Sequence, residues 1–123
     1  MKRTQHEKTK DIVNISILLT LILCLGIYLI ITTTVIAQDG VTFIEYAKAL
    51  DSSFVETVQR EYQHPGYPLL ILATYKISQF LEVPASVWTW IYSGQSVALL
   101  FRLLSVLVLF YIGRKITSSR KSF

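Results

Sequence analysis

Long apolar stretches without charge alternate with shorter mixed segments along this chain, and the alternation predicts its elements. Residues 12–38 hold no charged side chain and are rich in Ile and Leu on every helical face. As a helix this stretch would reach about 40 Å, whereas a bilayer core of ~30 Å needs only about 20 residues. We therefore expect a first transmembrane helix over residues 12–38, preceded by a basic cytoplasmic tail over residues 1–11.

The same apolar stretch also fits a cleaved signal peptide, because the start is basic and residues 35–37 end in a small side chain. The stretch is longer than the ~7–15 residues usual in a signal core, which favours an uncleaved anchor. Both interpretations place the amino terminus inside and Asp39 outside.

Residues 39–67 form the predicted external loop, and it carries an amphipathic helix. Asp39 and Gly40 break the apolar pattern, and the Asp39 carboxylate is suited to cap the helix that follows. We expect this helix to lie on the membrane surface with its apolar side down, and to end at Ser52 and Ser53 before a second polar segment. Its apolar face comprises Phe43, Tyr46, Ala47, Leu50 and Phe54.

Prolines around a glycine predict a tight turn over residues 64–68, with Pro68 placed to start the next helix. Residues 68–83 are the predicted short second membrane segment, interrupted by Lys76. This segment either crosses as a thin span, with Lys76 snorkelling, or only dips into the bilayer. Residues 84–94, which hold two Trp and a Tyr, are predicted to be an aromatic interfacial loop.

Residues 95–113 predict a third membrane helix that contains Arg102, and residues 114–123 a basic tail. The fold class is therefore all-α, with two or three hydrophobic membrane segments and an amphipathic external loop helix. Three crossings would leave the carboxyl-terminal basic residues outside, against the positive-inside tendency. Two crossings would put both basic ends inside, and the sequence leaves the choice open.

The composition agrees with a membrane protein, since 52% of the 123 residues are hydrophobic. The formal net charge is +4, and the basic residues cluster at both ends beside apolar stretches. This arrangement indicates contact with a lipid bilayer surface rather than with nucleic acid. Cys24 is the single cysteine, so no internal disulfide can form, and no zinc-binding spacing is present.

Asp39 is the candidate catalytic residue. A carboxylate one step outside a span can act as a general base toward a hydroxyl or amine acceptor, or can ligate a metal. A divalent cation is the one cofactor class that the sequence suggests. A plain helix cap explains an Asp before a Gly equally well. Glu45 and Lys48, three residues apart, are typical of a solvated pair.

His64, Tyr67 and Arg102 are the candidate substrate-binding residues. His64 can hold a phosphate or shuttle a proton beside the turn, although a turn position alone accounts for it. Tyr67 is also explained as an interfacial anchor. Arg102 is unfavourable inside a bilayer unless it meets an anionic lipid head, pairs with a neighbouring helix or snorkels.

Three stretches, in this order, resemble one family. Residues 39–50 (DGVTFIEYAKAL) are similar to the first external loop of polytopic GT-C-type membrane glycosyltransferases, which use polyprenyl-phosphate sugars and include the protein mannosyltransferases and the aminoarabinose lipid A transferases. Residues 64–70 (HPGYPLL) look like the His/Lys-Pro-Pro-Leu-Tyr-Pro stretch that opens the second span of that family. Residues 95–115 resemble its following helix, with an Arg-Leu pair and a terminal Gly-Arg-Lys.

The resemblance implies a transferase of the cell (inner) membrane, in which Asp39 activates the acceptor or helps to organise a metal while the sugar leaves its lipid phosphate at the outer face. Many members carry two acids where this chain has Asp39-Gly40, and the family has many more spans. The resemblance thus implies the amino-terminal portion of such an enzyme, as a fragment, a split gene product or a decayed copy. Such a portion is inactive alone, and other membrane helices or a partner chain would complete the cavity.

Two further hypotheses stay open. The chain is alternatively a non-enzymatic small membrane subunit or regulator, whose loop helix docks a partner. A third hypothesis is a transporter fragment built around Arg102.

Overall fold

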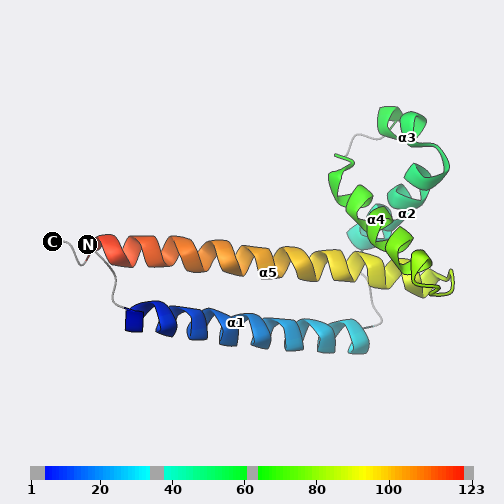
Figure 1. Ribbon diagram of the computed structural model, residues 1–123. Helices are drawn as coiled ribbons and strands as arrows, with labels where there is room; N and C mark the ends of the chain where they lie inside the picture. Colours follow the sequence, from blue (N-terminus) through cyan, green and yellow to red (C-terminus); the bar gives the residue numbers. More distant parts are fainter. Residues whose placement is uncertain (1–4, 34–37, 61–63, 121–123) are drawn as a thin grey trace. The chain divides into compact units, whose positions relative to one another are not determined.

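The structure is a computed structural model that describes residues 5–33, 38–60 and 64–120. The described residues form helices and no strand, so the predicted all-α class is confirmed (Figure 1). Residues 35–37, the cleavage site of the signal-peptide interpretation, lie outside the described residues. The helices are α1 (Gln5–Thr32), α2 (Gln38–Ser52), α3 (Phe54–Arg60), α4 (Gly66–Phe80) and α5 (Val87–Arg120).

Contacts divide the chain into two compact units. We call residues 1–29 together with 99–123 the helix pair, and residues 30–98 the bundle. Each unit is described by itself below.

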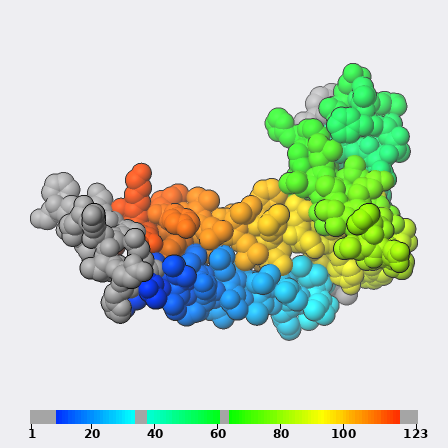
Figure 2. Space-filling model, in the orientation of Figure 1, coloured from blue at the N-terminus to red at the C-terminus, as the bar shows by residue number. Residues whose placement is uncertain are grey.

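The helix pair consists of α1 and the carboxyl-terminal part of α5, which run antiparallel side by side (Figures 1 and 2). The Asp11 carboxylate forms an ion pair with the Arg114 guanidinium near one end of the pair. At the other end, Gly26 lies against the side chain of Leu99. Fifteen residues separate Asp11 from Gly26, and fifteen separate Leu99 from Arg114, so one register holds over about 22 Å at ~1.5 Å per residue.

The positions between these two contacts follow the spacing of a helix–helix seam. On each helix the less exposed side chains recur every three or four residues, which is the periodicity of left-handed helix packing. On α1 they are Ile15, Leu19 and Ile22, and on α5 they are Leu103, Val106, Leu107 and Phe110. The apolar side chains off this seam stay exposed, as expected for helices that meet lipid.

Two helices of the described chain are long and apolar enough to cross a membrane, over Thr9–Thr32 and Val87–Thr117. Only 6% of the most apolar window of each is buried within the protein, which is consistent with contact with a lipid bilayer. The bounds of both helices differ from those expected: α1 ends at Thr32 and not at residue 38, but both helices extend into the predicted basic tails. α1 begins in the predicted basic tail at Gln5, and α5 continues to Arg120, because Gln, Glu, Lys and Arg are good helix formers.

The bundle is built on the packing of α2 against α4. Its buried core joins Ile44 and Ala47 of α2 to Ile71 and Tyr75 of α4 and to Trp90 of α5. The expectation that the apolar side of this loop helix rests on lipid is therefore wrong, because α4 covers that face. Tyr46, which is only 4% exposed, is likewise a core residue.

The predicted break after Ser52 is confirmed. α2 ends at Ser52 and α3 begins at Phe54, with Ser53 between them. The Thr57 hydroxyl donates a hydrogen bond to the Ala49 carbonyl (3.1 Å), which holds α3 against the end of α2. Phe54, expected on the apolar face of one continuous helix, belongs to α3 and is 51% exposed.

The predicted turn over residues 64–68 is confirmed only in its first part. His64 and Pro65 are non-helical, but α4 begins at Gly66, and Pro68 lies in its first turn, where a missing backbone N–H does no harm.

A tight reversal ends α4. Glu82 has a φ of 60°, in the left-handed region that usually takes glycine. Its N–H donates to the Gln79 carbonyl, and the Val83 N–H donates to the Ser78 carbonyl, both at 3.0 Å. These are the two hydrogen bonds of a Schellman motif, so α4 stops here and the chain turns toward α5.

The predicted aromatic loop over residues 84–94 is wrong from Val87 onward, where α5 begins. Ser86 explains the early start. Its Oγ accepts a hydrogen bond from the Thr89 N–H (3.1 Å), the bond made by a helix N-cap serine. The aromatic side chains that follow are therefore spread around a helix instead of lying together in a loop.

Candidate functional site

Asp39 lies in the first turn of α2 and is exposed. Because α2 begins at Gln38, Asp39 lies within the helix and is not the cap residue that precedes it. Glu45, six residues further on, is also exposed. Among the described residues, no group of three or more His, Cys, Asp or Glu side chains is placed to hold a metal ion.

Tyr67, in the second stretch that carries the family resemblance, contacts the first stretch and the residue just before the third. Its ring contacts the ring of Phe43 edge to face, with centroids 5.0 Å apart and an interplanar angle of 73°. Its hydroxyl donates a hydrogen bond to the Gly94 carbonyl at 3.4 Å, directly before Gln95. Phe43 is one turn from Asp39 on α2. The end of α2 that carries Asp39 therefore meets the start of α4 and a turn of α5.

Burial raises the pKa of the Tyr67 phenol above its ordinary value of 10.0, because the phenolate would lose hydration inside the bundle. The phenol is thus protonated and acts as a hydrogen-bond donor at neutral pH. The ring contact and the hydrogen bond of Tyr67 position α4 against α2 and α5. This role explains Tyr67 better than a role as an interfacial anchor does.

The other candidate residues are not gathered at this point. His64 is exposed at the turn before α4. Arg102 belongs to the helix pair and is exposed along the second candidate span. The Lys48 ammonium lies 5.8 Å from the centre of the Trp90 ring, a cation–π distance.

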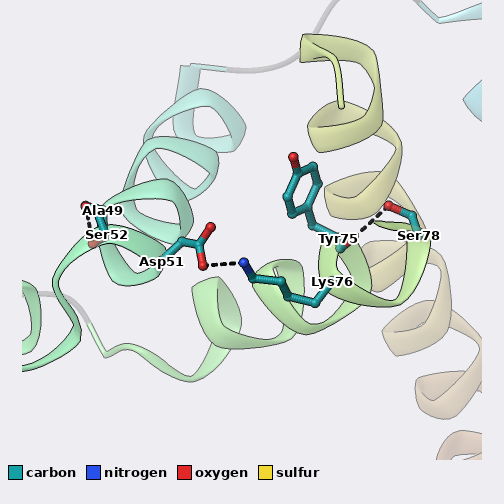
Figure 3. Close-up of polar contacts among 6 residues, drawn as sticks. All are labelled: Ala49, Asp51, Ser52, Tyr75, Lys76 and Ser78. Atoms are coloured by element: carbon teal, nitrogen blue, oxygen red, sulfur yellow. Dashed lines mark hydrogen bonds and ion pairs between the residues drawn. The ribbon is translucent and has the colours of Figure 1, made fainter. Parts of the chain in front are cut away.

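Lys76, which interrupts the apolar stretch of α4, forms an ion pair with Asp51 of α2 at 2.6 Å (Figure 3). Both side chains are partly exposed, at 56% and 35%, so the pair is solvated. Figure 3 also shows the Ser78 and Ser52 hydroxyls donating to the backbone carbonyls of Tyr75 and Ala49. A solvated Lys76 favours a position of α4 outside the bilayer core.

The bundle has an open cavity of about 390 Å³ between α4 and the start of α5. Six Ser and Thr side chains and two aromatic rings are among the residues that line it, and none of the predicted site residues does. Most of these hydroxyls already bond the chain nearby, as Thr74 does to the Leu70 carbonyl (2.8 Å) and Ser93 to the Thr89 carbonyl (2.8 Å). The lining residues are Thr74, Ser78, Val83, Pro84, Ser86, Trp88, Thr89, Tyr92, Ser93 and Ser96.

Ser and Thr recur at spacings of three or four residues over 74–78 and 86–96, and this recurrence is the sequence signal for the cavity. Comparisons of the chain with models of protein families, with curated proteins and with solved structures find no match.

Proposed function

We propose that this chain is a membrane glycosyltransferase-like protein whose bundle presents Asp39 to a polyprenyl-phosphate sugar at the outer face of the cell membrane. The observation that carries the proposal is the meeting of Phe43, Tyr67 and Gly94. These contacts bring together the first two stretches that resemble the family, and the hydrogen bond to Gly94 ends one residue before the third, beside one end of α2.

The exposed Asp39 carboxylate is suited to the role of general base. It accepts the proton of an acceptor hydroxyl as that oxygen forms a bond to the anomeric carbon of the sugar. The bond from the anomeric carbon to the phosphate oxygen breaks at the same time, and the polyprenyl phosphate leaves with the electron pair. The bonds, the proton and the charges of this step balance without a metal ion.

The helix pair supports the two-crossing topology as part of this proposal. The Asp11–Arg114 ion pair joins the amino-terminal end of α1 to the carboxyl-terminal end of α5. Both basic ends then lie on the cytoplasmic side, as the positive-inside tendency favours. Asp39 and the segment that connects the two spans lie on the outer side.

The test is transfer of a labelled sugar from a polyprenyl-phosphate donor in native membranes that contain the whole protein. We expect Asp39→Asn to lower transfer by roughly 10²- to 10⁴-fold, the usual contribution of a general base. Glu45→Gln is the matched control, because it removes the charge of an exposed carboxylate from the same helix. Equal activity in the two variants would remove Asp39 from the mechanism.

A non-enzymatic subunit or regulator is the second candidate. It is favoured by the apolar side chains that stay exposed on α3, Phe54 at 51% and Val55 at 67%, which are suited to contact a partner. The same assay separates the two proposals, because a regulator leaves transfer unchanged in both variants.

A further inference from the structure

We propose that Arg102 is a docking point for a partner protein, through a transmembrane helix that carries an Asp or Glu near the middle of the bilayer. The inference concerns assembly in the membrane and does not rest on sugar transfer.

The first step is the depth of Arg102. The second candidate span, Val87–Thr117, has 15 residues on either side of Arg102. The next charged residues outward from Asp11 and Arg114 are Lys10 and Lys115, so the Asp11–Arg114 ion pair marks one edge of the apolar region. Arg102 lies 12 residues from Arg114, about 18 Å along the helix, which is near the middle of a ~30 Å core.

The second step is that α1 offers no counter-charge. Arg102 is three residues from Leu99, and the register that puts Leu99 against Gly26 puts Arg102 level with Leu23. Residues 12–32 contain no Asp or Glu. Within the part of the chain that the structure describes, Arg102 is exposed and forms no ion pair, whereas Arg114 is paired with Asp11.

The third step compares the possible partners. Lipid phosphates lie outside the core, and Arg102 is about 12 Å from the nearer edge, farther than a side chain reaches by snorkelling. A second copy of this chain would bring another arginine, because the Val87–Thr117 span holds no acid either. Ionisable side chains inside a membrane are usually paired with one another. A carboxylate on a different transmembrane helix is the partner that fits both charge and depth.

The experiment is photo-crosslinking of the full chain in its native membrane. A photoreactive residue replaces Leu109, which is 66% exposed and lies two turns from Arg102 on nearly the same side of α5. The control position is Leu104, which is 46% exposed and points about 160° away from Arg102 at 100° per residue. Mass spectrometry then identifies the peptide that is joined to Leu109.

We expect an adduct at Leu109, absent at Leu104, with an apolar segment of another protein that contains an Asp or Glu. Arg102→Leu should lower its yield about tenfold or more, as removal of one partner of a buried charged pair does. Lys115→Leu, which removes an exposed charge outside the core, should leave the yield unchanged. An Arg102→Glu chain should recover the adduct when the partner acid is changed to Arg.

Any of five results would overturn the proposal, and the first four concern the adduct itself. They are an adduct with lipid only, an adduct with a second copy of this chain, a partner segment without an acid, and a yield that Arg102→Leu does not change. The absence of any adduct specific to Leu109 would overturn it as well. Recovery of the adduct when the two charges are exchanged shows that Arg102→Leu lowers the yield because the ion pair is lost and not because the chain fails to fold.

Discussion

Two neighbouring tryptophans on α5 have different environments and should therefore respond differently to truncation. Trp90 is 9% exposed, and its ring stacks on Tyr75 with centroids 3.7 Å apart and an interplanar angle of 11°. Trp88 is 51% exposed and faces Tyr92 at 6.3 Å. If both were interfacial anchors, as their sequence suggests, Trp88→Ala and Trp90→Ala would have similar effects.

The burial gives the expected size of each effect. A Trp side chain buries roughly 200 Å², which at about 25 cal/mol per Å² corresponds to about 5 kcal/mol. The 9% of Trp90 that stays exposed and the methyl group that alanine keeps reduce this to about 4 kcal/mol, within the usual range for Trp→Ala in a core. Trp88 buries about half its surface beside an open cavity, so Trp88→Ala should remove about 2 kcal/mol or less.

The assay is amide hydrogen exchange of the whole chain in bicelles, read on peptides from α2 and α4. Because about 1.4 kcal/mol corresponds to a factor of ten, Trp90→Ala should lower the protection of both helices by about three orders of magnitude, and Trp88→Ala by about one. Peptides from α1 are an internal control, since this helix does not contribute to the bundle core. Equal loss of protection in the two variants would refute the packing of α5 into the bundle.

Other predictions concern single positions. Gly26→Leu should weaken the helix pair by about 1–3 kcal/mol, because the larger side chain overpacks the contact with Leu99. The readout, in a Cys24→Ser background, is a lower disulfide yield between Leu19→Cys and Val106→Cys. Gly113→Leu should leave this yield unchanged, because nothing lies within 4 Å of that position. Glu82→Gly should stabilise the bundle by about 1 kcal/mol in urea unfolding, because a left-handed backbone is unfavourable for a side chain, and Glu82→Ala should give no such gain. Because the folded pKa of Tyr67 is raised, its stabilising contribution is complete below about pH 10 and is lost as the pH rises toward that folded pKa. Tyr67→Phe should abolish this alkaline loss and remove one late step from the ultraviolet tyrosinate titration, and an unchanged titration would contradict the burial of Tyr67.

The sequence was sufficient for the features that depend on local chemistry. The apolar stretches predicted the long helices, and Ser52-Ser53 and Pro65 marked real interruptions. The ends of the helices were harder to predict, because the cap at Ser86 and the left-handed residue Glu82 use residue types that occur in many other contexts.

The partners of amphipathic faces could not be predicted from one sequence. The apolar side of α2 is the same whether lipid or α4 covers it, and only the shared core, which holds Ala47 of α2 with Ile71 and Tyr75 of α4, distinguishes the two. The same holds for the junction at Tyr67, since a hydrogen bond across 27 residues has no local signal. The pairing of Asp11 with Arg114 is equally non-local, and it favours two crossings over three.

Side-specific labelling tests the central claim most directly. In intact cells that carry the Cys24→Ser chain, a membrane-impermeant thiol reagent is applied to Val55→Cys and, separately, to Lys115→Cys, both exposed positions. The two-crossing account predicts labelling of Val55→Cys from outside and of Lys115→Cys only after the membrane is opened. Labelling of both positions from the same side would contradict it.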